Sequence, residues 1–143
     1  MMADANLIFA SPRRDKRSGM EISMTKKQLA LEVIDRLKKE YPDAGCTLEY
    51  DDAWKLLVSV RLAAQCRDAR VNIVVEGLFE KYTSVAALAE ADVDDIERIV
   101  HPCGLGRSKA RDISACMKML HEEYNDCVPD DFDALLKLPG VGR

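Results

Sequence analysis

The last six residues of the chain, 138–143, read Leu-Pro-Gly-Val-Gly-Arg, a run typical of a tight turn that follows a helix. Pro139 stops the preceding helix because it lacks a backbone N–H group. Gly140 and Gly142 let the backbone turn sharply and approach a ligand that a Cβ would push away. A second helix should begin after such a turn, with its positive N-terminal end toward a bound phosphate. The run therefore predicts an anion-binding hairpin, and the chain ends where its second helix would start.

The rest of the sequence is patterned for helices. Apolar residues recur at helical spacing, and no segment shows sustained alternation of the kind expected in strands. The expected helices cover residues 26–41, 51–62, 68–79, 84–91, 92–100, 107–124 and 129–138. Asp51, Asp68 and Asp92 are the expected N-caps of three of them, and Ser84 is expected to start a fourth. Gly104 and Gly106 are expected to break the helical pattern, and the chain is predicted to be all-α with short connections.

Charge and hydropathy limit the partners that the chain can have. Its formal net charge is −4, which is not the footprint of a protein that binds nucleic acid over its whole surface, although a local basic face remains compatible with it. No stretch approaches the ~20 apolar residues of a membrane span. The start of the chain lacks the basic residues and long apolar run of a signal peptide, so we expect a cytoplasmic protein without membrane contact.

Residues 1–23 have no helical periodicity, and we interpret them as a flexible leader. Residues 11–19 are basic and turn-rich, so this segment could also be an arm that touches phosphates. The translation start could be Met1, Met20 or Met24. The five cysteines have no spacing typical of a metal or redox motif, and His101 and His121 add no zinc spacing. We expect reduced, mostly buried thiols and no metal site.

Three segments, residues 62–72, 103–110 and 138–143, occur together in the order and at the separations of one enzyme family. Over residues 24–143 the chain resembles the N-terminal part of endonuclease III, a DNA glycosylase with lyase activity in the helix-hairpin-helix superfamily. The resemblance implies one all-α domain, a helical bundle of the helix-hairpin-helix DNA glycosylase type, over residues 24–143. It also implies that this domain is incomplete at the C-terminus, truncated within the hairpin.

The resemblance assigns DNA contacts to several residues. The residue matching Gln65 enters the space left by a flipped base, where an amide offers both a donor and an acceptor. Leu105, which follows Gly104, matches an apolar wedge between base steps. Ser108 can cap the next helix, and Lys109 can meet a phosphate as a point charge.

The terminal turn completes the expected DNA surface. The N–H groups of Gly140, Val141 and Gly142, together with Arg143, should contact a phosphate, which positions a protein without reading base sequence. The expected partner is duplex DNA that carries a damaged base or an abasic site.

Catalysis in the resembled family needs residues that lie beyond position 143. A lysine directly after the arginine that matches Arg143 attacks the sugar C1′ and forms a Schiff base. A later aspartate and four cysteines that hold a [4Fe–4S] cluster also belong to the complete enzyme, and the cysteines present here do not have that cluster's spacing. We therefore expect no catalytic residue and no cofactor within this chain, which should be inactive alone.

The reaction implied by the resemblance is base-excision repair, with N-glycosylase action on oxidised pyrimidines and abasic-site lyase activity. Two other interpretations remain open from the residues alone. The chain could be a noncatalytic helix-hairpin-helix DNA-binding module, or a helical interaction domain. Apolar residues of the 26–41 helix, among them Val33, Ile34 and Leu37, would be exposed without further helices to cover them, which predicts self-association.

Overall fold

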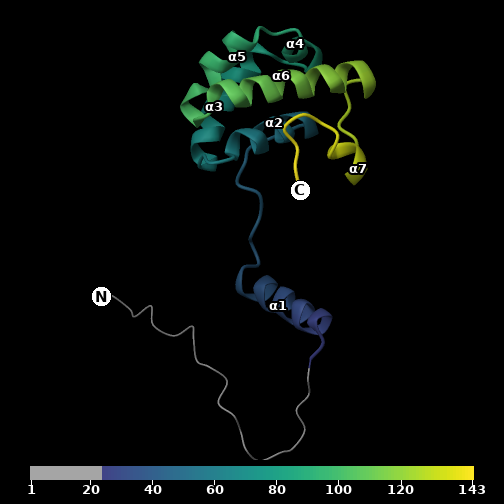
Figure 1. Cartoon of the computed structure of the whole chain (residues 1–143). Coiled ribbons are helices and arrows are strands. Elements are labelled where there is room, and N and C mark those ends of the chain that lie inside the picture. The colour runs from purple at the N-terminus through teal and green to yellow at the C-terminus, as the bar shows by residue number, and fades with distance from the viewer. Residues whose placement is uncertain (1–23) are drawn as a thin grey trace, which may run out of the picture. The chain divides into compact units, whose positions relative to one another are not determined.

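The computed structural model describes residues 24–143, in which every regular element is a helix (Figure 1). The leader expected at 1–23 lies outside the described residues. The helices are α1 (Lys26–Glu40), α2 (Ala53–Ala63), α3 (Asp68–Lys81), α4 (Val85–Ala89), α5 (Val93–Val100), the 3₁₀ helix η1 (His101–Cys103), α6 (Gly106–Glu123) and α7 (Phe132–Leu135). The all-α prediction is confirmed. The chain divides after Ala44 into two units, which are described separately.

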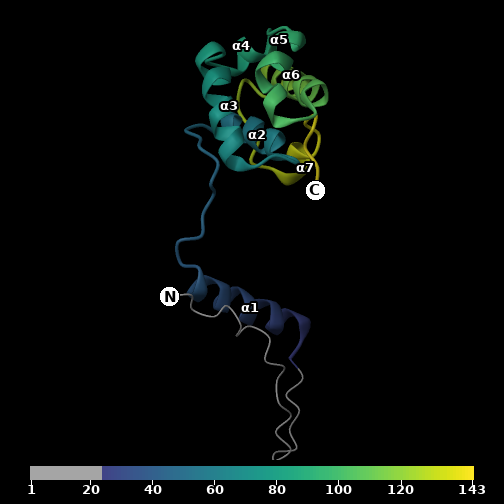
Figure 2. The ribbon, with the colours of Figure 1, turned by 90° about the vertical axis from the view of Figure 1, so that its left-hand side faces the viewer.

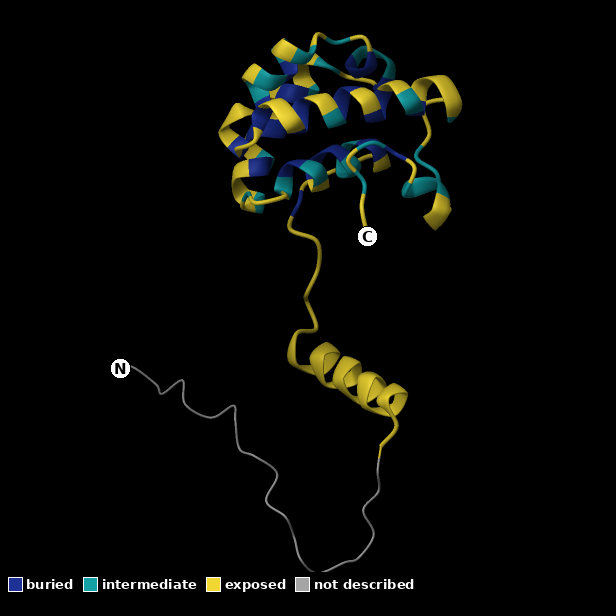
Figure 3. Ribbon diagram, in the orientation of Figure 1, coloured by how far each residue is buried: buried dark blue, intermediate teal, exposed yellow. Residues whose placement is uncertain are grey.

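The core of residues 45–143 is organised around α6. Helices α4 and α5 pack against one side of α6, while α2 packs against another and also contacts α3 (Figures 1 and 2). One face of α6 is therefore buried and the opposite face is exposed, as the alternating colours of Figure 3 show. Buried side chains of α6 include Ile113, Met117 and Leu120. Each such side chain contributes about 1.5–3 kcal/mol by leaving water.

Of the three expected N-caps only Asp92 is confirmed, and Ser84 caps the helix that it is expected to start. The Ser84 side chain accepts a hydrogen bond from the Ala87 N–H (3.1 Å), and the Asp92 side chain accepts one from the Asp94 N–H (2.7 Å). Both bonds satisfy an N–H group that has no partner inside its helix.

The predictions for Asp51 and Asp68 are wrong. Asp52 is the N-cap of α2, and Asp51 instead forms an ion pair with Lys55 (2.7 Å). Asp68 is the first residue of α3, and its carboxylate accepts a hydrogen bond from the Thr47 hydroxyl. Each carboxylate thus binds another side chain instead of capping its helix, and N-cap propensity does not predict these partners.

The last two helices differ in extent from their predictions. Helix α6 begins at Gly106, so this glycine does not interrupt the helical pattern. Gly106 is buried, and an added Cβ would lie 3.2 Å from the His101 Cα. Helix α7 begins after the expected start at position 129 because Asp131 caps it, accepting from the Ala134 N–H at 2.8 Å, and it ends at Leu135, before the expected end at position 138.

Helix α1 forms the regular part of its own unit. Thr25 and Gln28 cap it reciprocally, which satisfies otherwise unpaired N–H groups at its start. None of its residues is buried, and Val33, Ile34 and Leu37 are 46%, 45% and 52% exposed (Figure 3). The exposure expected for these three side chains is confirmed.

The cysteines are less buried than expected. All five are free thiols, but only Cys103 and Cys116 are buried, while Cys46 and Cys127 are exposed. Burial raises the pKa of both the Cys103 and the Cys116 thiol to about 11, so these two groups stay protonated at neutral pH. None of the helices in the described part of the chain is both long and apolar enough to traverse a bilayer.

One ion pair at the end of α6 gives the fold a pH dependence. His121 Nδ1 lies 2.8 Å from Asp126 Oδ1, and this hydrogen bond raises the pKa of His121 above its ordinary value of 6.5. A histidine whose pKa rises on folding stabilises the fold at low pH and loses that contribution as the pH rises through the folded pKa. We expect the stability difference between the wild type and His121→Gln to be largest below about pH 6 and to shrink as the pH rises through the raised pKa of His121.

Urea unfolding at several pH values measures this difference. Asp126→Asn is the matched control, because Asp126 has a φ of 63° and asparagine tolerates that backbone. It should remove the same pH dependence. If the stability of the wild type and of both variants changed with pH in the same way, the His121–Asp126 ion pair would not be the source of the pH dependence.

Candidate nucleic-acid interface

Gln65 lies at the tip of the loop between α2 and α3. Helix α2 ends at Ala63, Ala64 is its C-cap, and Gln65 follows with a φ of 59°. This left-handed conformation is usual for glycine after a helix and unfavourable for other residues. Gln65 is exposed, so its amide is available to a ligand. The fold therefore holds a polar side chain at a strained position where glycine would be easier.

Leu105 occupies a similar position between η1 and α6. It is the N-cap residue of α6, with φ 52° and ψ 34°, and its side chain is 58% exposed. Gly104, directly before it, has a φ of 71°. An exposed leucine at a left-handed loop tip adds nothing to the core of this unit, and such strain is typical of functional sites.

The two loop tips belong to one surface. A groove brings the 65–70 segment against the 102–104 segment, although the two are about forty residues apart in sequence. Two exposed arginines of the first segment line it and supply positive charge. The lining residues are Gln65, Cys66, Arg67, Arg70, Pro102, Cys103 and Gly104. The sequence analysis did not single out Arg67 or Arg70, although both lie within five residues of Gln65.

Lys109 lies beneath these loops and not on the surface. It is fully buried, and its Nζ donates hydrogen bonds to the carbonyl oxygens of Leu62 and Cys103, each at 2.8 Å. The exposed point charge expected from the sequence is absent at this position. The ammonium instead joins the last turn of α2 to the end of η1.

Ser108 stands near the start of α6 without capping it. Leu105 is the N-cap of this helix, and no side-chain cap hydrogen bond is formed there. The Ser108 hydroxyl is exposed and lies 3.5 Å from Arg61 Nη2. Ser108 is thereby linked to the residue that supports the terminal turn.

The terminal turn begins at a buried residue and is closed by a hydrogen bond of its own. Leu138 is 2% exposed, and the Val141 N–H donates to the Leu138 carbonyl oxygen at 3.1 Å. Of the three N–H groups expected to face a phosphate, that of Val141 is thus used within the turn. Among residues 24–143, the N–H groups of Gly140 and Gly142 have no hydrogen-bond acceptor. Arg143 is exposed, with its Cζ 5.9 Å from the centroid of the Phe132 ring.

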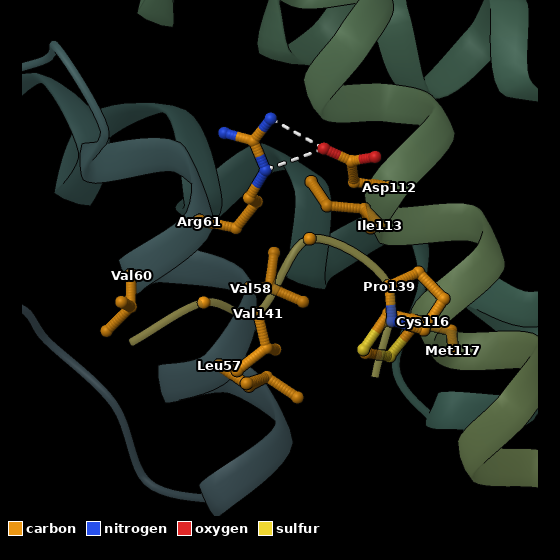
Figure 4. A pocket seen from close by; sticks show the side chains of 12 residues that line it. Leu57, Val58, Val60, Arg61, Asp112, Ile113, Cys116, Met117, Pro139 and Val141 are labelled. Carbon is orange, nitrogen blue, oxygen red and sulfur yellow. Dashed lines mark hydrogen bonds and ion pairs between the residues drawn. The ribbon is translucent and has the colours of Figure 1, made fainter. Parts of the chain in front are cut away.

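Gly140 is required both by its backbone and by its surroundings. Its φ is 78°, and an added Cβ would lie 2.8 Å from Asp112 Cβ and 3.2 Å from Arg61 Cδ. Arg61 donates from Nε (2.8 Å) and Nη2 (2.6 Å) to the same Asp112 oxygen (Figure 4). This half-buried ion pair between α2 and α6 forms the platform on which the turn rests. Sequence analysis missed Arg61 and Asp112, which are 51 positions apart and share no motif.

An apolar cavity of about 140 Å³ lies beside this platform. In Figure 4, Val141 reaches toward Leu57 and Val58 of α2, while Cys116 and Met117 of α6 line the other side. The Val141 side chain therefore packs the turn against the core by apolar contact. The two glycines beside it remain at the surface.

The described residues do not fit the iron–sulfur cluster that the sequence resemblance implies for a complete enzyme. No group of three or more histidine, cysteine, aspartate or glutamate side chains is arranged to hold a metal ion within residues 24–143. Cys103 and Cys116 are buried in the core with raised pKa values, which opposes formation of the thiolate that metal binding needs.

The short helix α7 and the glycine turn after it, packed on a helical core, form the first part of a helix-hairpin-helix arrangement. Residues 58–136 match the HhH-GPD superfamily of base excision DNA repair proteins, and the chain belongs to this superfamily.

Endonuclease III sequences and structures are similar to most of the chain. Endonuclease III of Synechocystis sp. is 44% identical over 119 residues, which cover 83% of this chain and 54% of that protein. The Bacillus subtilis endonuclease III is 39% identical over 110 residues, which cover 77% and 50%. A trapped endonuclease III–DNA covalent intermediate, the estranged-adenine complex, superposes with a TM-score of 0.77 at 42% identity, over 84% of this chain and 56% of that one. The chain thus spans about half the length of the curated relatives it matches.

Proposed function

We propose that this chain supplies a DNA-engaging face of an endonuclease III-type enzyme of base-excision repair, with N-glycosylase action on oxidised pyrimidines and abasic-site lyase activity. The observation that carries the proposal is the pair of exposed left-handed residues, Gln65 and Leu105, on loops that share one groove. Its partner would be duplex DNA with a damaged base or an abasic site.

The chemistry of the two tips suits an extruded base. A flipped nucleotide leaves a gap in the stack and an unpaired partner, at a cost of a few kcal/mol. Leu105 can fill such a gap as an apolar wedge, and the Gln65 amide can hydrogen-bond the orphaned base through its donor and its acceptor. Arg67 and Arg70 beside them can neutralise phosphates of the distorted strand.

The terminal turn would position the protein on the duplex. The unpaired N–H groups of Gly140 and Gly142 can donate to a phosphate, and the Arg143 guanidinium adds charge there. Ser108 is a further candidate contact. Lys109 is left out of this surface because its ammonium is buried. The solved complexes that superpose on this chain contain DNA, which supports a DNA partner here.

Binding of abasic and intact duplexes tests the proposal. The wild-type chain should prefer a duplex with a tetrahydrofuran abasic analogue over the intact duplex, and Leu105→Ala or Gln65→Ala should reduce that preference by about tenfold. Affinity for the intact duplex should change little, since no gap exists there to fill. Fluorescence anisotropy at low salt gives both dissociation constants.

Ile73→Ala is the matched control, because Ile73 is another large apolar residue that is 70% exposed, on α3 and outside the groove. It should leave the preference unchanged. Equal binding of both duplexes, with no effect of Leu105→Ala, would favour the noncatalytic DNA-binding module. Absence of DNA binding together with stable self-association would favour the interaction domain, for which the exposed apolar residues of α1 are the candidate surface.

A further inference from the structure

We propose that Lys109 is a positioning residue that fixes Gln65 and Leu105 relative to each other, so that both can enter one gap in the DNA. The inference deepens the proposed function and rests on it. Its basis is a single buried ammonium that bonds the backbone of the helix end before each loop, 2.8 Å from Leu62 O and 2.8 Å from Cys103 O.

The two accepting carbonyls lie just before the loop tips. Leu62 precedes Gln65 by three residues in the last turn of α2, and Cys103 precedes Leu105 by two residues at the end of η1. Carbonyl groups at a helix end lack intrahelical partners and carry partial negative charge. One ammonium therefore terminates two helices at once and sets the distance between the residues that follow them.

Packing alone does not account for a lysine at this site. Lys109 is fully buried, and no carboxylate within residues 24–143 forms an ion pair with it. It also stands in the first turn of α6, where the helix dipole opposes a positive charge. A methionine would fill similar space without the cost of burying a charge. What a methionine could not supply is the pair of hydrogen bonds to the two loops.

The backbone at both tips needs such support. Gln65 (φ 59°) and Leu105 (φ 52°) are non-glycine residues in the left-handed region. Such conformations persist only where the surrounding structure over-determines them. Each loop also has a turn hydrogen bond of its own, Cys66 N–H to Ala63 O (2.9 Å) in one and Gly104 N–H to His101 O (3.0 Å) in the other. Neither of these bonds connects one loop to the other, as the Lys109 ammonium does.

Lys109→Met tests the positioning role, because it removes both hydrogen bonds of the ammonium and leaves the inserting residues Gln65 and Leu105 unchanged. We expect the preference for the abasic over the intact duplex to fall by about tenfold, with affinity for the intact duplex retained. A 2-aminopurine base opposite the abasic site should also lose the fluorescence change that insertion of the tips produces. Leu120→Val is the matched control, since Leu120 is buried in the same helix but lies away from the groove. It should lower stability without changing the preference.

The outcomes distinguish this inference from the proposed function. If Leu105→Ala and Gln65→Ala leave the preference unchanged, the proposed function fails. If they lower the preference while folded Lys109→Met keeps the wild-type value, only the role of Lys109 is overturned.

Lys109→Arg keeps the test decisive if Lys109→Met does not fold. The guanidinium retains donors for both carbonyls but is larger, so it must push the ends of α2 and η1 apart. We expect the preference to fall severalfold, less than in Lys109→Met. A wild-type preference in folded Lys109→Arg would overturn the inference.

Discussion

Gly140→Ala should destabilise the fold by about 2–4 kcal/mol and abolish the phosphate contact that we propose for the terminal turn. Alanine is strained at a φ of 78°, and its Cβ would meet Asp112 Cβ at 2.8 Å. Because the colliding atom is a Cβ fixed on helix α6, no change of rotamer relieves the contact. The turn must therefore move away from its platform. Urea unfolding measures the stability, and anisotropy with intact duplex measures the binding.

Gly142→Ala is the matched control for this prediction. An added Cβ at Gly142 meets nothing within 4 Å, and its φ is not in the left-handed region. Stability should stay within about 0.5 kcal/mol of the wild type. If Gly142 faces a phosphate as proposed, DNA affinity should still fall because the methyl group blocks close approach. Equal stability of the two alanine variants would refute the steric argument for Gly140.

Asp112→Ala should cost about 1–3 kcal/mol of stability, because it leaves the Arg61 guanidinium without its partner under the turn. The two side chains are 21% and 31% exposed, so the loss is smaller than for a fully buried pair. Thermal or urea unfolding measures it. DNA affinity is a poor readout here, since removal of a carboxylate also makes the surface more positive.

A double-mutant cycle with Arg61→Met isolates the interaction. If the ion pair carries the effect, the double variant should be less destabilised than the sum of the two single variants. Asp112→Asn keeps an acceptor without the charge and should lose less stability than Asp112→Ala. Strict additivity of the two single variants would show that the pair does not hold the turn.

Helix positions followed from the sequence because they depend on local pattern. Apolar spacing located the seven α-helices of residues 24–143 but not the 3₁₀ helix η1, and Asp92 caps its helix as propensity predicts. Errors arose where a distant partner competed with local preference. Asp68 bonds Thr47, 21 positions away, and Gly106 packs against His101, so neither residue behaves as its local sequence suggests.

Only part of the candidate site could be predicted from the sequence. Gln65 and Leu105 came from a family resemblance, and their exposure and left-handed backbones agree with exposed loop tips. Lys109 shows the limit of this approach. A lysine after a glycine-rich loop is usually solvated, and only the packing of α6 against α2 and η1 places this ammonium in the interior.

The sequence by itself determined the helical class, the superfamily and the terminal turn, since these depend on residue spacing and on short motifs. Tertiary structure alone decided which groups meet. It placed Lys109 between two loop ends, set Arg61 and Asp112 under Gly140, and used the Val141 N–H within the turn. These contacts join residues up to 51 positions apart or depend on backbone direction. Neither property leaves a periodic signal in a single sequence, because both arise when helices pack.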